Sequence, residues 1–219
     1  MISKNHKLIV LMPPKTASNS LRGTLENCGV NFYIDPNPKP QIHLKLSEIV
    51  ERYDVKNLND FKIIQLTRNP YERFVSSFFF QKKIIPKNIK TPFSNFSLEE
   101  FTIHLKESLD SGNFIKEFYG DESFIINTIN SGTSWGGSRL YDTQISWNDL
   151  GVKINHFKLE DINYEIERIR TTVNLPIENF LHLNSQNINE NYRNLMTPKV
   201  KEVVLELFEN DFEFFGYEK

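Results

Sequence analysis

Two strand–loop–helix units near the start of the chain limit what it can fold into. In the first, an apolar strand over 7–12 leads through a short loop at 13–18 into a helix that stops near Gly29. In the second, a strand over 61–66 precedes a helix from Pro70, and a proline in the first turn of a helix costs no hydrogen bond. Because consecutive units of this kind place their strands side by side and parallel, we predict an α/β fold with a parallel sheet.

Later segments carry the signals of further helices and of one more strand. Ser97 and Glu100 have the spacing of a capping box, and Thr197 followed by Pro198 is typical of a helix start. These patterns predict a strand over 152–157 and helices over 44–53, 97–109, 160–173 and 198–211. The 219 residues show no break in composition, so we expect one domain over 1–219.

The charge balance and the apolar runs narrow the class of protein. Lys and Arg number 26 against 28 Asp and Glu, and the net charge of -2 predicts no nucleic-acid partner. The first apolar run, over 8–12, has five residues, far fewer than the ~20 that cross a bilayer, so we expect no membrane span and no secretory signal. Cys28 is the single cysteine and cannot form an internal disulfide, which is compatible with a cytoplasmic location.

The loop and helix start at 13–20 have the properties of a phosphate-binding turn. Backbone N–H groups and the positive end of the helix dipole attract an anion where a strand ends and a helix begins. Lys15 adds a positive charge, and the small residues at 16–20 let an anion approach the backbone. The two glycines of an ordinary P-loop are absent, which disfavours a common ATP or GTP site. The alternative is a polar loop that only caps its own helix.

A second candidate phosphate contact follows the second strand. Arg68 would emerge at the same sheet edge as Lys15, and its forked guanidinium suits a phosphate. Ser76 lies eight residues further on, where its hydroxyl can face back. One ligand with two separated phosphates would then bridge both loops. Alternatively, Arg68 pairs with a carboxylate such as Glu72, and Ser76 is only a small residue packed against the sheet.

The segments PKTASNSL and RNPYERFVS together resemble the paired donor-binding motifs of the PAPS-dependent sulfotransferases, especially their carbohydrate-modifying branch. PAPS is 3′-phosphoadenosine-5′-phosphosulfate, the sulfuryl donor, and PAP is the product that remains after transfer. The resemblance implies a P-loop-like three-layer α/β/α fold with a central parallel sheet, and no metal. It implies that Arg68 and Ser76 hold the 3′-phosphate and that the 5′-phosphosulfate is held by Lys15, Thr16, Ala17, Ser18, Asn19 and Ser20. Asn19 departs from the family, which commonly has threonine there.

Weaker resemblances extend along the chain. His43 lies ahead of a helical pattern in a run that is similar to the family segment that often supplies the catalytic base. Gln144 and Trp147 lie in a stretch that resembles a family segment near the acceptor, and 195–217 resembles the family's C-terminal helix and tail. Trp135 is followed by two glycines, which makes it a candidate lid or acceptor wall, with an ordinary loop anchor as the alternative.

Together these residues predict transfer of a sulfuryl group from PAPS to a hydroxyl of a carbohydrate-like acceptor. In-line transfer needs charge neutralisation at the leaving phosphate, for which we expect Lys15, and removal of the acceptor's proton. A histidine with an ordinary pKa of ~6.5 suits that removal, so His43 is the expected base, with Glu48 and Glu72 as alternatives. A nucleoside or small-molecule kinase and a nucleotide-binding module without turnover stay open as other functions. The acceptor's identity and the oligomeric state are left open by the sequence.

Overall fold

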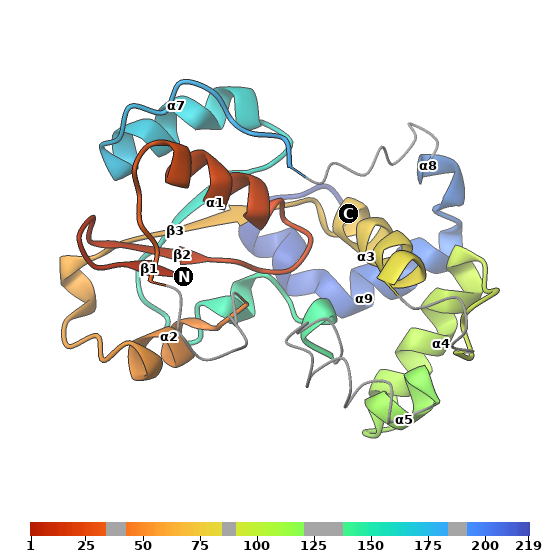
Figure 1. Cartoon of the computed structure of the whole chain (residues 1–219). Coiled ribbons are helices and arrows are strands. Elements are labelled where there is room, and N and C mark those ends of the chain that lie inside the picture. Colours follow the sequence, from red (N-terminus) through yellow and green to blue (C-terminus); the bar gives the residue numbers. More distant parts are fainter. Residues whose placement is uncertain (34–42, 85–90, 121–137, 184–191) are drawn as a thin grey trace. The chain divides into compact units, whose positions relative to one another are not determined.

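Four strands, three from the first third of the chain and one from residues 155–158, form a single sheet (Figure 1). The structure is a computed structural model that describes residues 1–33, 43–84, 91–120, 138–183 and 192–219. The strands follow one another across the sheet in the order β1 (Ile2–Ser3), β2 (Leu8–Leu11), β3 (Lys62–Thr67) and β4 (Asn155–Lys158). β2, β3 and β4 pair in parallel, while β1 pairs antiparallel to β2. The predicted α/β class is therefore confirmed, and the sheet is mostly parallel, with β1 as the antiparallel exception to the prediction.

The chain forms two compact units, each made of two separate stretches of sequence. The first unit comprises 1–68 and 144–185 and contains all four strands named above. The second unit comprises 69–143 and 186–219, and the elements described in it are helical. The expectation of a single domain over 1–219 stays a prediction.

Both faces of the sheet in the first unit are covered, and the side-chain alternation of β2 shows how. Leu8 and Val10 pack with α1 (Ser18–Asn27) and α7 (Ile162–Val173), whereas Ile9 and Leu11 pack with α2 (Leu46–Arg52). Figure 1 shows α1 and α7 on one side of the sheet and α2 on the other. All four residues of β2 are buried, as expected for a parallel strand covered on both faces.

Most helix ends predicted from local sequence signals lie within a few residues of the ends in the structure. α1 ends ahead of Gly29, whose φ of 85° gives the left-handed conformation that stops a helix. The predicted helices over 44–53 and 160–173 correspond to α2 and α7, and the strand over 152–157 to β4. β1 was not predicted, because a strand of only two residues carries no periodicity.

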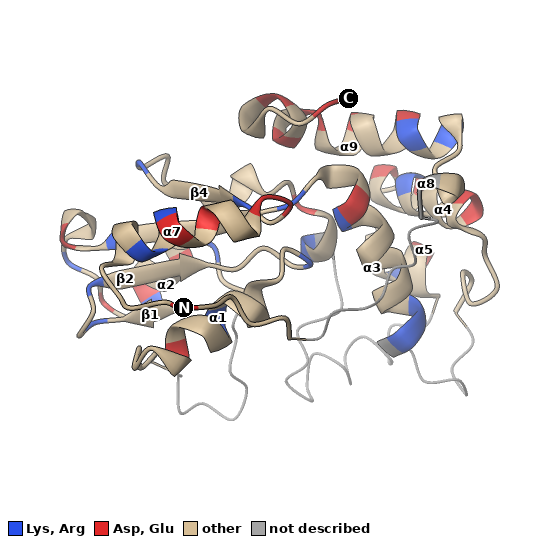
Figure 2. Ribbon diagram, turned by 90° about the horizontal axis from the view of Figure 1, so that it is seen from above, with Lys and Arg blue, Asp and Glu red and all other residues tan. Residues whose placement is uncertain are grey.

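The exposed face of α7 carries charges of both signs, as Figure 2 shows. Arg170 Nη1 lies 3.0 Å from Glu167 Oε2, three residues before it on the same helix. Pairs of opposite charge at this spacing neutralise one another locally and contribute little stability at an exposed surface. In the described part of the chain, no helix is long and apolar enough to cross a bilayer.

The second unit is organised around a core rich in phenylalanine. Its elements are α3 (Pro70–Ile84), α4 (Leu98–Asp110), α5 (Phe114–Tyr119), η2 (Ser138–Tyr141), α8 (Tyr192–Leu195) and α9 (Pro198–Phe215). The predicted capping box of α4 is confirmed: Ser97 Oγ accepts from Glu100 N, and Glu100 Oε2 accepts from Ser97 N. α4 and α3 both pack against α9, and Phe74, Phe101 and Phe208 meet in this core.

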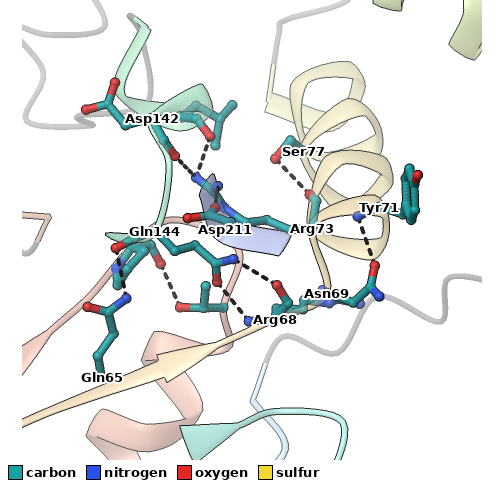
Figure 3. Close-up of polar contacts among 12 residues, drawn as sticks. Gln65, Arg68, Asn69, Tyr71, Arg73, Ser77, Asp142, Gln144 and Asp211 are labelled. Atoms are coloured by element: carbon teal, nitrogen blue, oxygen red, sulfur yellow. Dashed lines mark hydrogen bonds and ion pairs between the residues drawn. The ribbon is translucent and has the colours of Figure 1, made fainter. Parts of the chain in front are cut away.

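A buried arginine joins three parts of the second unit. Arg73 on α3 is 1% exposed, and its Nη2 donates to the carbonyls of Leu140 at 3.1 Å and Asp142 at 2.7 Å (Figure 3). Its Nη1 lies 3.7 Å from Asp211 Oδ2 on α9, and the guanidinium stacks over Phe208. Because an arginine stays charged when buried, it depends on these carbonyls and on the carboxylate.

We expect Asp211→Asn to destabilise the second unit strongly, by about 3 kcal/mol in the free energy of unfolding, because it removes the carboxylate that pairs with the buried Arg73 charge. Urea unfolding followed by circular dichroism measures this change. Glu202→Gln on the same helix is the matched control, since Glu202 pairs with Lys199 at the exposed surface and should change stability little. Equal effects of the two substitutions would contradict this role for the buried pair.

Candidate functional site

The backbone of the loop after β2 is strained in a way that suits an anion site. Lys15 has a φ of 67° and Ala17 a φ of 57°, left-handed conformations that cost a residue with a Cβ roughly 1–2 kcal/mol. Turns of this kind direct successive N–H groups into one concavity. The first hydrogen bond of α1 runs from Leu21 N to Ala17 O, so the N–H groups of 18–20 precede the helical ladder. The loop therefore combines a helix N-terminus with a shaped backbone turn.

The hydroxyl groups of this loop are used inside the protein. Thr16 Oγ1 donates to Pro13 O at 2.8 Å, and Ser18 Oγ donates to the same carbonyl at 3.0 Å. Ser20 Oγ accepts from Leu183 N at 3.0 Å. All three hydroxyl residues are buried, so they shape and fasten the loop. Any contacts to an anion here would thus fall to backbone N–H groups and to the partly exposed residues Lys15, Ala17 and Asn19.

Arg68 lies against the Lys15 loop within the first unit. The parallel register pairs Leu11 with Gln65, so β2 and β3 end at the same sheet edge. Arg68 Nη1 donates to Lys15 O at 3.4 Å, a long contact that places the guanidinium beside the loop. Ser76 belongs to the second unit, where it is buried on α3. A shared phosphate pocket of Arg68 and Ser76 stays a prediction.

Gln144 holds the backbone of Arg68 from both sides, as Figure 3 shows. Arg68 N donates to Gln144 Oε1 at 2.8 Å, and Gln144 Nε2 donates to Arg68 O at 2.8 Å. Gln65 Nε2 in turn donates to Gln144 O at 3.0 Å. Both glutamines are fully buried. An acceptor contact for Gln144 is disfavoured by this geometry, because the amide is enclosed and bonded to Arg68.

His43 lies beside the start of the same loop. Its Nδ1 is 2.6 Å from Met12 O, and since a carbonyl only accepts, Nδ1 carries the hydrogen. The neutral ring therefore has its lone pair on Nε2, as a proton acceptor requires. The edge of Trp147 packs on this ring with centroids 6.3 Å apart. Trp147 is fully buried and so supports His43 in place of forming an open acceptor wall, while Trp135 lies outside the described residues.

The environment of His43 lowers its pKa from the ordinary 6.5 to about 4. Burial is the largest cause, and the bond to Met12 O opposes it. The positive charge of the N-terminus and, as the smallest cause, that of Lys15 also lower this pKa. At neutral pH the imidazole is therefore uncharged, but a pKa of about 4 makes it a weaker proton acceptor than the ordinary histidine expected from the sequence.

Among the alternative bases, Glu48 has a structural task. Its Oε2 accepts a hydrogen bond from Lys45 N at 2.8 Å and so caps α2. Gln65 was missed at the sequence level, although it left a signal. It is a polar residue in the middle of the apolar strand Lys62–Thr67, and a buried amide in a core strand needs a hydrogen-bond partner.

Comparison with family models, with curated proteins and with solved structures found no match to this chain. The residues of the site therefore carry the functional argument. They bring Lys15, Arg68 and a neutral His43 together at one edge of the sheet in the first unit.

We expect acid to destabilise the fold through His43. Because its folded pKa of about 4 lies below the ordinary 6.5, the unfolded state binds a proton in this window that the folded state does not. The free energy of unfolding should therefore fall as pH drops from 6.5 towards 4. His43→Gln, which keeps an N–H for Met12 O, should reduce that slope by up to ~1.4 kcal/mol per pH unit in denaturant titrations.

His156→Gln is the parallel variant for this measurement, because burial also lowers the pKa of His156 to about 4. Each substitution should remove part of the slope, and the double variant should remove more than either. A slope that is unchanged in all three proteins would contradict the buried, neutral state of these rings.

Proposed function

We propose that this chain is a PAPS-dependent sulfotransferase that transfers a sulfuryl group to a hydroxyl of a carbohydrate-like acceptor. The observation that carries the proposal is the meeting of the Lys15 loop and Arg68 at one sheet edge. The loop follows one parallel strand and Arg68 follows the next, which is where ligands bind in open α/β sheets. The proposal includes the P-loop-like three-layer fold of that family and a cytoplasmic location.

The donor would span the two strand ends. Its 5′-phosphosulfate would accept hydrogen bonds from backbone N–H groups at the start of α1 and meet the charge of Lys15. Its 3′-phosphate would meet Arg68, with Ser76 as the second contact that the family resemblance implies. Arg68 is suited to this because a guanidinium forms paired hydrogen bonds to phosphate oxygens.

Sulfuryl transfer then requires one bond to form and one to break. The acceptor oxygen attacks the sulfur, and the bond from sulfur to the bridging phosphate oxygen breaks, so that PAP leaves with the electron pair. The acceptor's proton passes to Nε2 of His43, and Lys15 neutralises the charge that develops on the phosphate. The Nδ1–H bond to Met12 O supports this assignment, because it leaves the lone pair on Nε2.

Ligand binding separates this proposal from the kinase alternative. PAP should raise the melting temperature of the protein by several degrees, while ATP with Mg²⁺ should change it little, because only a ligand that fits the folded state stabilises it. Thermal unfolding with each nucleotide at equal concentration measures the difference. Equal shifts, or a larger shift with ATP and Mg²⁺, would overturn the assignment of the donor.

His43→Ala should reduce the rate of transfer by a factor of ~10²–10⁴, the usual contribution of a general base, and leave the affinity for PAP nearly unchanged. Labelled PAPS with a panel of carbohydrate acceptors measures transfer, and calorimetry measures PAP binding. His104→Ala is the control, since His104 also bonds a carbonyl, that of Phe118, and belongs to the second unit. Full transfer activity in His43→Ala would show that His43 is not the base. If the unmodified protein binds PAP but transfers no sulfuryl group, the nucleotide-binding module without turnover would be favoured.

A further inference from the structure

The side chain of Gln144 holds the backbone of Arg68 by a pair of hydrogen bonds. Its side-chain amide accepts a hydrogen bond from the N–H of Arg68 and donates one to the C=O of Arg68, each at 2.8 Å. One amide group therefore bonds both backbone polar groups of a single residue. Gln144 is 0% exposed, and its own carbonyl accepts from Gln65 Nε2 on β3. The clamp is thus anchored to the strand that Arg68 follows.

This two-point contact constrains the direction of the Arg68 side chain. One hydrogen bond leaves a backbone free to turn about it, but two bonds to the same residue fix both the position and the orientation of that residue. Arg68 follows the last residue of β3, where the ladder no longer holds the chain. Gln144 holds the backbone of Arg68 where the strand ladder ends, and the start of the Arg68 side chain is fixed with it.

We propose that Gln144 is a positioning residue that aims Arg68 at the 3′-phosphate of the nucleotide. The inference rests on the proposed function, and it deepens it by giving Gln144 a task on the donor side in place of the acceptor side. Gln144 acts through Arg68 and touches no ligand itself. Its loss therefore weakens recognition of the 3′-phosphate and leaves recognition of the 5′-phosphate in place.

The test compares PAP with adenosine 5′-monophosphate, which lacks the 3′-phosphate. The unmodified protein should bind PAP more tightly than AMP. Gln144→Met, which has similar size but no amide, should reduce this preference about tenfold, while its affinity for AMP changes little. Arg68→Ala should remove most of the preference, and adding Gln144→Met to Arg68→Ala should cause no further loss, as expected for residues that act in series.

Two measurements separate positioning from general stability. Gln81→Met is the matched control, since Gln81 is also a fully buried glutamine, bonded to Tyr119 OH, and should keep the full PAP preference. Hydrogen exchange of the Arg68 amide should accelerate at least about tenfold in Gln144→Met, with or without nucleotide. Where Gln144→Met does not fold, Gln144→Glu keeps the bond from Arg68 N, loses the one to Arg68 O, and should show the same loss of preference.

The outcomes distinguish the two proposals. No preference for PAP in the unmodified protein would overturn the proposed donor itself, even if Arg68 exchange responds as expected. A clear preference that survives Gln144→Met or Gln144→Glu, or one that falls equally with Gln81→Met, would overturn the role of Gln144 alone. Loss of affinity for both nucleotides in equal measure would also overturn it, because it would show a purely structural effect.

Discussion

The parallel pairing of β2 with β3 is the constraint on which the candidate site depends. Leu8 pairs with Lys62 and Leu11 with Gln65, so both strands end at one edge. A slip by one residue would exchange the two faces of β2, and each face is packed by different helices. The two apolar clusters therefore fix the register, and the positions of the loop at 13–18 and of Arg68 follow from it.

The loop at 13–18 uses its residues differently from what their types indicate. Its hydroxyls bond to the loop's own carbonyl at Pro13, and these bonds help to hold Lys15 and Ala17 in their left-handed conformations. The N–H groups at the start of α1 are consequently set in place before any ligand arrives. Under the proposed function, binding then requires little ordering of the loop, which is the usual advantage of a preorganised site.

Features that depend on neighbours in sequence were predictable, and those that depend on distant partners were not. The final helix was predicted to run to about Asp211, and it continues to Phe215. Asp211 is buried against Arg73, a partner on another helix that no local pattern reveals. Proximity of Arg68 to the first loop could be predicted from parallel topology alone, whereas the task of Gln144 depends on which backbone its amide meets.

One short turn in the first unit contacts both Arg68 and His43. Gln144 directly precedes the turn η3 (Ile145–Trp147) and holds the backbone of Arg68 by two hydrogen bonds, while Trp147 at its end makes a T-shaped contact with the ring of His43. His43 has a hydrogen bond of its own, from Nδ1 to Met12 O, and this bond sets the direction of its ring. Under the proposed function, this turn would thus support both the residue expected at the donor phosphate and the residue expected as the base.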